Sequence, residues 1–124
     1  MDIILSVKPK YLKRIYHGTK SIEIRKQIPR QLKPNELVWF YESGKGAITG
    51  FGRYQGYKVV TPKEALEFYS DQMDVTDTEF RNYVGDATEL VLLRFKWVAH
   101  MDTGIPLSYF GLKRAPQSYC YIDD

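Results

Sequence analysis

The sequence predicts an α+β fold that is mainly β: a small, mostly antiparallel β-barrel flanked by short helices. Three observations predict it. Runs of strand length, apolar or alternating, recur along most of the chain. Two capping boxes mark the starts of short helices. Most neighbouring strands are joined by turns too short for a crossover, which favours antiparallel pairing. A chain of 124 residues suits one domain with one core, so we expect residues 1–124 to form a single domain.

The first part of the chain reads as strand, helix, strand, loop and strand. Residues 3–7 form a short apolar strand. A helix then begins at Pro9 and stops at Gly18, because proline suits the first helical turn and glycine suits the position after the last one. Residues 21–26 alternate in polarity as a half-buried strand does, and residues 37–41 form a dense aromatic strand.

Glycines shape the next strand. A strand over 47–54 contains Gly50 and Gly52, and glycine inside a strand indicates a bulge, a sharp corner or a close backbone approach. We expect the strand to continue over 57–60 after a kink at Gly56.

The second half supplies two helices and two more strands. Capping boxes at 61–64 and 76–79 start the helices, because a threonine side chain and a glutamate three residues later satisfy each other's backbone N–H groups. The longest strand covers 89–99. A loop over 106–111 and a final strand over 118–122 complete the chain.

The charges are separated along the chain. The segment from Lys8 to Lys33 carries nine basic residues and one acid, whereas the segment from Pro62 to Glu89 carries eight acids and two basic residues. A basic face favours an anionic partner, of which nucleic acid is the commonest. We expect the acidic segment to face away from that ligand.

Several functional classes are disfavoured. No apolar run approaches the about 18 residues of a membrane span, and no secretory signal is visible, so we expect no membrane association. The single cysteine, Cys120, predicts a packed thiol in a reducing cytoplasm. The two histidines, His17 and His100, lack metal-ligand spacing, so we expect no metal and no cofactor.

The densest polar pattern follows the first helix. Ile22 and Ile24 are expected to enter the core, which leaves Glu23 and Arg25 on the other face of the strand, roughly 7 Å apart. At that spacing the two side chains contact either each other or one small ligand. A glutamate offers acceptors and an arginine offers a planar set of donors, which together match the edge of a nucleobase.

Segments distributed over nearly the whole chain resemble the ASCH domain, a branch of the PUA-like superfamily. The opening pair, Ile4–Pro9 and Ile15–Lys26, contains a Gly-x-Lys-x-x-Glu-x-Arg stretch. Further segments are similar to one ASCH subgroup, the predicted regulators with a PUA-like domain: Trp39–Ser43, Ile48–Phe51, Phe80–Gly85 and Ala115–Tyr119.

The resemblance implies a PUA-like barrel with a cleft near the first helix, a place associated with RNA binding and, in sister families, with single modified nucleobases. Carried onto this chain, it predicts a binding module for RNA or a modified nucleobase. The expected ligand-binding residues are Lys20, Glu23, Arg25, Tyr41, Ser43, Gln117 and Ser118. Of these, Tyr41 would stack on the base. The expected phosphate contacts are Lys8, Lys10 and Lys13.

Two alternatives stay open, although we favour binding over catalysis. Some ASCH proteins resemble amidohydrolases of N4-acetylcytidine that use a lysine, a threonine and a carboxylate, and others have been proposed as ribonucleases. Lys20 matches the lysine, but Glu23 stands where that pattern has threonine, so an enzyme would need Ser21 as its nucleophile. The second alternative is a protein-interaction module that uses the acidic helix pair, Pro62–Gly85. The sequence does not predict an oligomeric state.

Overall fold

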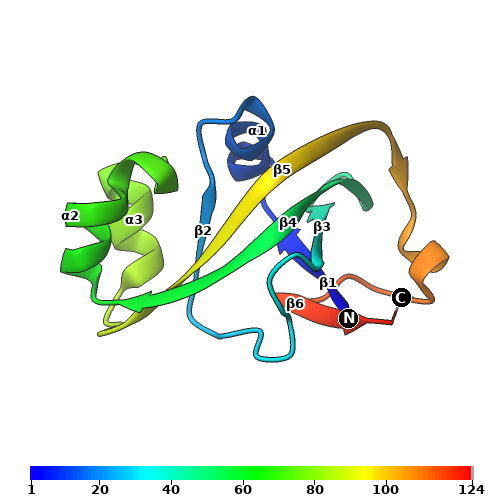
Figure 1. Cartoon of the computed structure of the whole chain (residues 1–124). Coiled ribbons are helices and arrows are strands. Elements are labelled where there is room, and N and C mark those ends of the chain that lie inside the picture. Colours follow the sequence, from blue (N-terminus) through cyan, green and yellow to red (C-terminus); the bar gives the residue numbers. More distant parts are fainter. Residues whose placement is uncertain (124) are drawn as a thin grey trace.

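Six strands form one curled sheet in the computed structural model, which describes residues 1–123. The order across the sheet is β2-β5-β4-β3-β1-β6, and the long β4 and β5 sweep across the molecule (Figure 1). The strands are β1 (Asp2–Val7), β2 (Ile22–Arg25), β3 (Leu37–Glu42), β4 (Ala47–Val60), β5 (Leu90–Ile105) and β6 (Tyr119–Ile122).

The pairing is mostly antiparallel, as predicted. Within the described residues, β1 and β3 form the one parallel pair, and the other neighbouring strands run antiparallel. The parallel pair is possible because the helix and strand between β1 and β3 provide a long connection. The predicted fold class, α+β and mainly β, is confirmed.

The barrel is not closed by backbone hydrogen bonds, because β2 and β6 are the two edges of the sheet. Side chains connect these edges instead. Arg25 Nη1 donates to Ser118 Oγ at 3.1 Å, and the Tyr119 hydroxyl donates to the Ile28 carbonyl at 3.4 Å. On the same side, the Gln31 backbone N–H donates to the Tyr121 hydroxyl at 3.0 Å. We call this gap the seam. Its one side is β2 and the loop that follows it, and its other side is β6 and the residues that precede it.

In the described part of the chain, three helices flank the sheet: α1 (Pro9–His17), α2 (Pro62–Met73) and α3 (Asp77–Val84). The predicted starts of α2 and α3 are confirmed, since Thr61 with Glu64 and Thr76 with Glu79 form complete capping boxes. A 3-10 turn, η1 (Leu107–Phe110), occupies the predicted loop. In Figure 1, α1 lies above the sheet and the α2–α3 pair covers one end of it.

The core is divided by the sheet. One cluster packs α1 against the inner face and includes Leu12, Val38 and Phe40. A second cluster packs α2 and α3 against β2, β4 and β5, and it contains the predicted core residues Ile22 and Ile24. A third, smaller cluster lies under η1 and β6. The division leaves β2 between the first and second clusters, where the seam opens.

The close backbone approach and the kink predicted from the glycines of β4 are both present in the structure. A Cβ on Gly50 would lie 2.6 Å from the Tyr16 ring and 2.4 Å from the Ala99 carbonyl oxygen, so α1 packs directly on the backbone there. Gly56 has a φ of 99°, and the pairing of β4 with β5 shifts register around it. The strand nevertheless continues through this kink to Val60.

Candidate functional site

A cavity of about 460 Å³ lies at the seam, between β2, α1 and α3. Its size falls within the range of small-molecule sites in proteins. The end of β1, the β3–β4 turn and the segment before β6 complete its wall. The lining residues are Ser6, Lys8, Lys10, Tyr11, Lys20, Glu23, Ile24, Arg25, Ser43, Val75, Glu79, Phe80, Asn82, Tyr83 and Gln117.

Glu23 and Arg25 contact each other, which is the first of the two outcomes that the sequence left open, and both side chains also line the cavity. The Arg25 guanidinium donates to Glu23 Oε2 at 2.8 Å, to the Ser6 carbonyl at 2.7 Å and to Ser118 Oγ at 3.1 Å. These bonds use three of the five guanidinium N–H donors. Arg25 therefore joins three strand ends across the seam and keeps donors for a ligand.

Lys20 is almost completely buried, with 2% of its surface exposed. Its Nζ donates to the Met73 carbonyl at the end of α2 at 2.7 Å and lies 3.5 Å from Glu23 Oε1. Burial is the main influence on this amine and lowers the pKa of Lys20 below 10.5, although Glu23 acts in the opposite direction. Lys20, Glu23 and Arg25 thus form a continuous polar row along the cavity wall.

One acid of the acidic segment, Glu79, lines the cavity, so the expectation that the segment faces away is wrong for this residue, although the other seven acids do not line the cavity. Glu79 of α3 lines the cavity and accepts two hydrogen bonds from Arg14 of α1, at 2.7 and 3.1 Å, while Lys10 Nζ lies 3.1 Å away. Arg14 also donates to the Asp74 carbonyl at 3.0 Å. Opposite charges separated along the sequence attract each other in the fold, so α3 packs against the basic helix and closes one side of the cavity.

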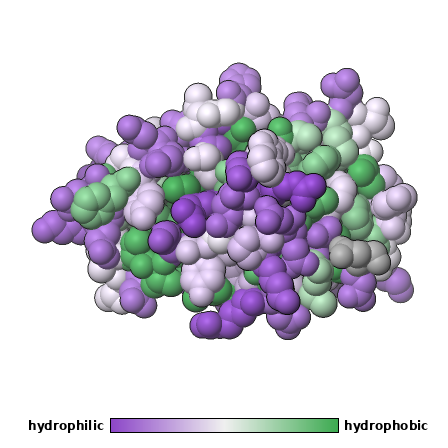
Figure 2. Space-filling view, in the orientation of Figure 1, coloured by the Kyte–Doolittle hydropathy of each residue, from purple (hydrophilic) through white to green (hydrophobic). Residues whose placement is uncertain are grey.

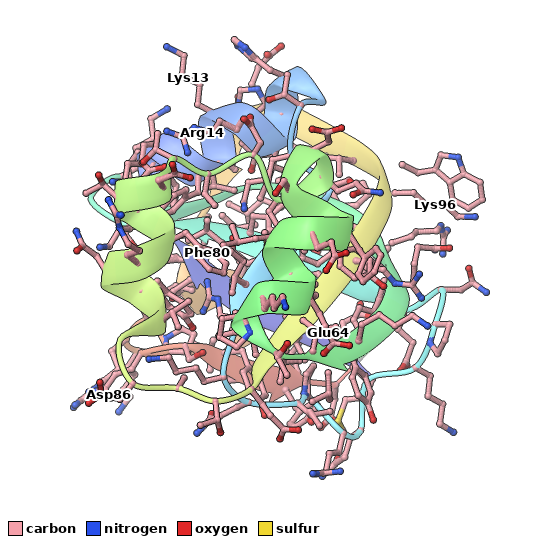
Figure 3. All side chains as sticks on the ribbon, turned by 90° about the vertical axis from the view of Figure 1, so that its left-hand side faces the viewer. Lys13, Arg14, Glu64, Phe80, Asp86 and Lys96 are labelled. Carbon is pink, nitrogen blue, oxygen red and sulfur yellow. The ribbon has the colours of Figure 1, made fainter. Side chains whose placement is uncertain are left out.

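Figure 3 shows how the helices present these side chains. Arg14 lies above α3, where it reaches Glu79, and Phe80 points from α3 into the interior. Lys13 points away from both. Of the three predicted phosphate contacts, Lys8 and Lys10 line the cavity, whereas Lys13 does not.

The other predicted residues divide in the same way. Ser43 and Gln117 line the cavity, and Ser118 holds Arg25 in place. Tyr41 is not brought to the cavity: it packs with Trp39 against the third core cluster, because strand alternation sends it to the face opposite Phe40. Ser21, the nucleophile that an enzyme would need, is also absent from the wall.

Sequence reasoning missed the contributions of Tyr11, Glu79, Asn82 and Tyr83 to this wall. Glu79 and Tyr83 are four residues apart on α3 and therefore share a helix face. The sequence did carry one signal for Glu79. The first helix is basic and the helix that starts at the second capping box is acidic, so the two helices could be expected to attract each other.

The described part of the chain gives two further findings. It contains no helix long and apolar enough to cross a membrane. Residues 1–123 also contain no group of three or more His, Cys, Asp or Glu side chains arranged to hold a metal ion.

The fold is similar to that of solved ASCH structures. The ASCH protein from Zymomonas mobilis is 18% identical, with a TM-score of 0.84 over 98% of this chain and 87% of that chain. A variant of that protein is 16% identical, with a TM-score of 0.86 over 98% of this chain and 88% of the other. The hypothetical protein PH0355 is 18% identical, with a TM-score of 0.58 over 77% of this chain and 98% of that one. At such identities the likeness shows the fold alone, and the predicted ASCH resemblance is confirmed at that level.

Sequence comparison identifies the family. No curated protein sequence matches the chain. A family profile described as "Domain of unknown function (DUF365)" matches residues 1–108, which is most of this chain. The chain therefore has the fold of an ASCH domain and belongs to the DUF365 family.

Proposed function

We propose that the seam cavity binds one nucleobase, carried by an unpaired nucleotide of RNA or by a modified nucleoside. The observation that carries this proposal is the polar row of Lys20, Glu23 and Arg25 on the wall of a cavity of about 460 Å³. Amine and guanidinium donors beside a carboxylate acceptor are complementary to the mixed edge of a base.

The surrounding wall supports a nucleotide rather than an apolar ligand. Tyr83 replaces Tyr41 as the aromatic face that can stack on a base. Gln117 is exposed at the rim and carries both an amide donor and an acceptor. Lys8 lies directly before α1 and Lys10 in its first turn, and both are exposed, so these cavity-lining lysines are candidates to contact a phosphate.

The first test is a thermal-shift screen with ordinary and modified nucleosides, followed by RNA titration at several salt concentrations. A ligand at 100 times its Kd stabilises the fold by about 2.7 kcal/mol. Arg25→Ala should abolish the shift. Gln117→Ala, at an exposed position whose side chain forms no hydrogen bond within residues 1–123, should weaken binding without lowering the Tm of the free protein. A flat screen together with a flat RNA titration contradicts the proposal.

The burial of Lys20 next to Glu23 supports a second candidate, an amidohydrolase acting on N4-acetylcytidine-like nucleosides or a ribonuclease. A lysine with a lowered pKa beside a carboxylate is a candidate general base. Since Ser21 does not line the cavity, such an enzyme would have to activate water directly. Release of acetate from N4-acetylcytidine, lost in Lys20→Ala, would support this candidate.

The protein-interaction alternative is weakened by the acids that it would use. Glu79 is paired with Arg14 and Lys10, and Asp74 accepts a hydrogen bond from Thr19 at 2.7 Å. These two acids are therefore engaged within the fold, whereas the exposed acids of the pair, Glu64, Glu67, Asp71 and Asp77, are the ones that a partner would have to use. Partner binding that depends on Asp74 and ignores Arg25 would restore the alternative. The cytoplasmic location stays a prediction from the single cysteine.

A further inference from the structure

A second hollow, of about 520 Å³, lies farther along the same seam. The loop after β2 forms one wall with Lys26, Gln27 and Arg30, and Tyr119 of β6 forms the other. Glu89, just before β5, is the acid that lines it. The proposed function does not use this hollow.

The two hollows are joined by shared structural elements. Lys26 directly follows Arg25 on the β2 side, and its Nζ lies 5.0 Å from the centre of the Tyr83 ring, which lines the first cavity. On the other side, Tyr119 directly follows Ser118, which accepts the hydrogen bond from Arg25. Both walls of the second hollow therefore continue walls of the first, and the Arg25–Ser118 bond marks the boundary between them.

The second hollow carries a net positive charge, because Lys26 and Arg30 outnumber Glu89, although Ile28, Val59 and Val91 also line it. Lys26, Gln27 and Arg30 are exposed. Within residues 1–123, neither Lys26 nor Arg30 forms an ion pair with an acidic side chain, in contrast to Lys10 and Arg14 beside α3. Figure 2 shows hydrophilic residues gathered along the lower edge of the molecule, over the loop that follows β2. A cationic hollow open to solvent suits phosphate groups.

We propose that the second hollow holds the phosphates of the nucleotides that flank a base seated in the seam cavity, so that single-stranded RNA follows the seam past Lys26 and Arg30. This inference rests on the proposed function. It selects an RNA strand over a free nucleoside as the ligand, because a free nucleoside has no group to place in the second hollow.

The test compares a paired set of variants on ligands of different length. The ligands are the four nucleoside 5′-monophosphates, measured by calorimetry, and fluorescein-labelled RNA octamers of each base, measured by anisotropy. Lys26→Ala/Arg30→Ala should weaken octamer binding on the order of tenfold at low salt and reduce the salt slope by about 1.4, since each phosphate contact on a single strand contributes about 0.7. Monophosphate binding should not change.

The matched control is Lys96→Ala/Lys113→Ala, which removes the same charge at exposed positions outside both hollows. It should have at most a small effect on the octamers. Glu89→Gln provides a test that poor folding cannot imitate, because removing this carboxylate from the second hollow should raise octamer affinity.

The outcomes separate the two proposals. One outcome is that the monophosphates bind, that Arg25→Ala abolishes their binding, and that the octamers bind no more tightly than the monophosphates. This outcome refutes the proposed phosphate-binding role of the second hollow and leaves the cavity proposal standing. Equal losses of octamer affinity in the Lys26/Arg30 and control variants also refute the proposed role of the second hollow. Lower octamer affinity in Glu89→Gln refutes it as well. If neither monophosphates nor octamers bind, both proposals fail.

Discussion

Lys20 shows most clearly how one residue combines structural and chemical roles. The sequence places it between a helix stop and a strand, where a lysine is usually exposed. In the structure it is buried, its amine joins the end of α2 to Glu23, and burial lowers its pKa below 10.5. Burying a charged amine costs stability unless the amine is paired and hydrogen-bonded, and the Met73 carbonyl and Glu23 provide these partners.

Lys20 should make stability depend on alkaline pH. Because the pKa is lowered in the folded state, the unfolded chain binds the proton more strongly at pH values below 10.5. The unfolding free energy of the wild type, relative to Lys20→Met, should therefore rise as the pH increases toward 10.5. The slope is at most about 1.4 kcal/mol per pH unit. Denaturant titrations of both proteins at pH 7 to 10 measure it, and a difference that falls with pH contradicts the assignment.

Gly50 shows how tertiary packing restricts the size of a side chain at one position. A methyl group there would meet both the Tyr16 ring and a backbone carbonyl, whereas one on Gly52 would meet a Val98 methyl at 3.2 Å. Gly50→Ala should lower the unfolding free energy by about 3 kcal/mol, and Gly52→Ala by clearly less, since overpacking against backbone cannot relax. Equal effects in chemical denaturation would show that α1 does not pack on β4 as described.

At the scale of elements, α1 and α3 are held together by charge. Arg14 and Lys10 meet Glu79, and the same glutamate also closes the capping box that starts α3 by accepting from the Thr76 amide at 2.9 Å. The Arg14 guanidinium holds the pKa of the Glu79 carboxyl well below 4.5. One side chain thus starts the helix and docks it over the cavity.

Glu79→Gln tests this docking, because glutamine keeps the oxygen for the cap and removes the charge. The unfolding free energy at pH 7 should fall by about 1 kcal/mol. The wild-type contribution is present above pH 4.5 and is lost as the pH falls below it, so the difference between the two proteins should shrink in acid. Glu67→Gln, on an exposed part of α2, is the control and should change neither quantity.

At the scale of the whole molecule, the site exists because the sheet does not close. Both edges, β2 and β6, have one backbone partner each, and side chains span the seam between them. The residues that line the cavity at the seam therefore come from elements that lie at opposite ends of the sheet order, Glu23 and Arg25 of β2 and Gln117 before β6.

Hydrogen exchange should report this arrangement. Amides in the centre of β4 and β5, which have neighbours on both sides, should exchange most slowly, and those of the four-residue β6 should exchange much faster. A saturating RNA octamer should slow exchange in β2 and β6 more than in β4. Mass spectrometry of peptides from each strand measures both effects, and protection confined to α2 would point to a different binding surface.

Local features of the sequence predicted most of the fold. Capping boxes, the Gly18 helix stop, the kink at Gly56 and the alternation around Ile22 and Ile24 act within a few residues, so each could be identified without the fold. Two members of the polar row were predicted for the same reason, because strand alternation alone places Glu23 and Arg25 on one face, whereas Lys20 was expected there only from the ASCH resemblance.

The errors concern partners that are distant in the chain. The sequence could not show that Tyr41 packs under η1, or that the acidic α3 docks on α1 and supplies Glu79 and Tyr83 to the cavity wall. By itself, the sequence determined the types of the elements, the starts of the helices and the polar face of β2, since hydrogen bonding and side-chain period are local, but it ended β5 at residue 99 where the strand continues to Ile105. Only the tertiary structure decided that the barrel stays open and which residues meet across its seam, because that depends on how sheet curvature and opposite charges bring remote segments together.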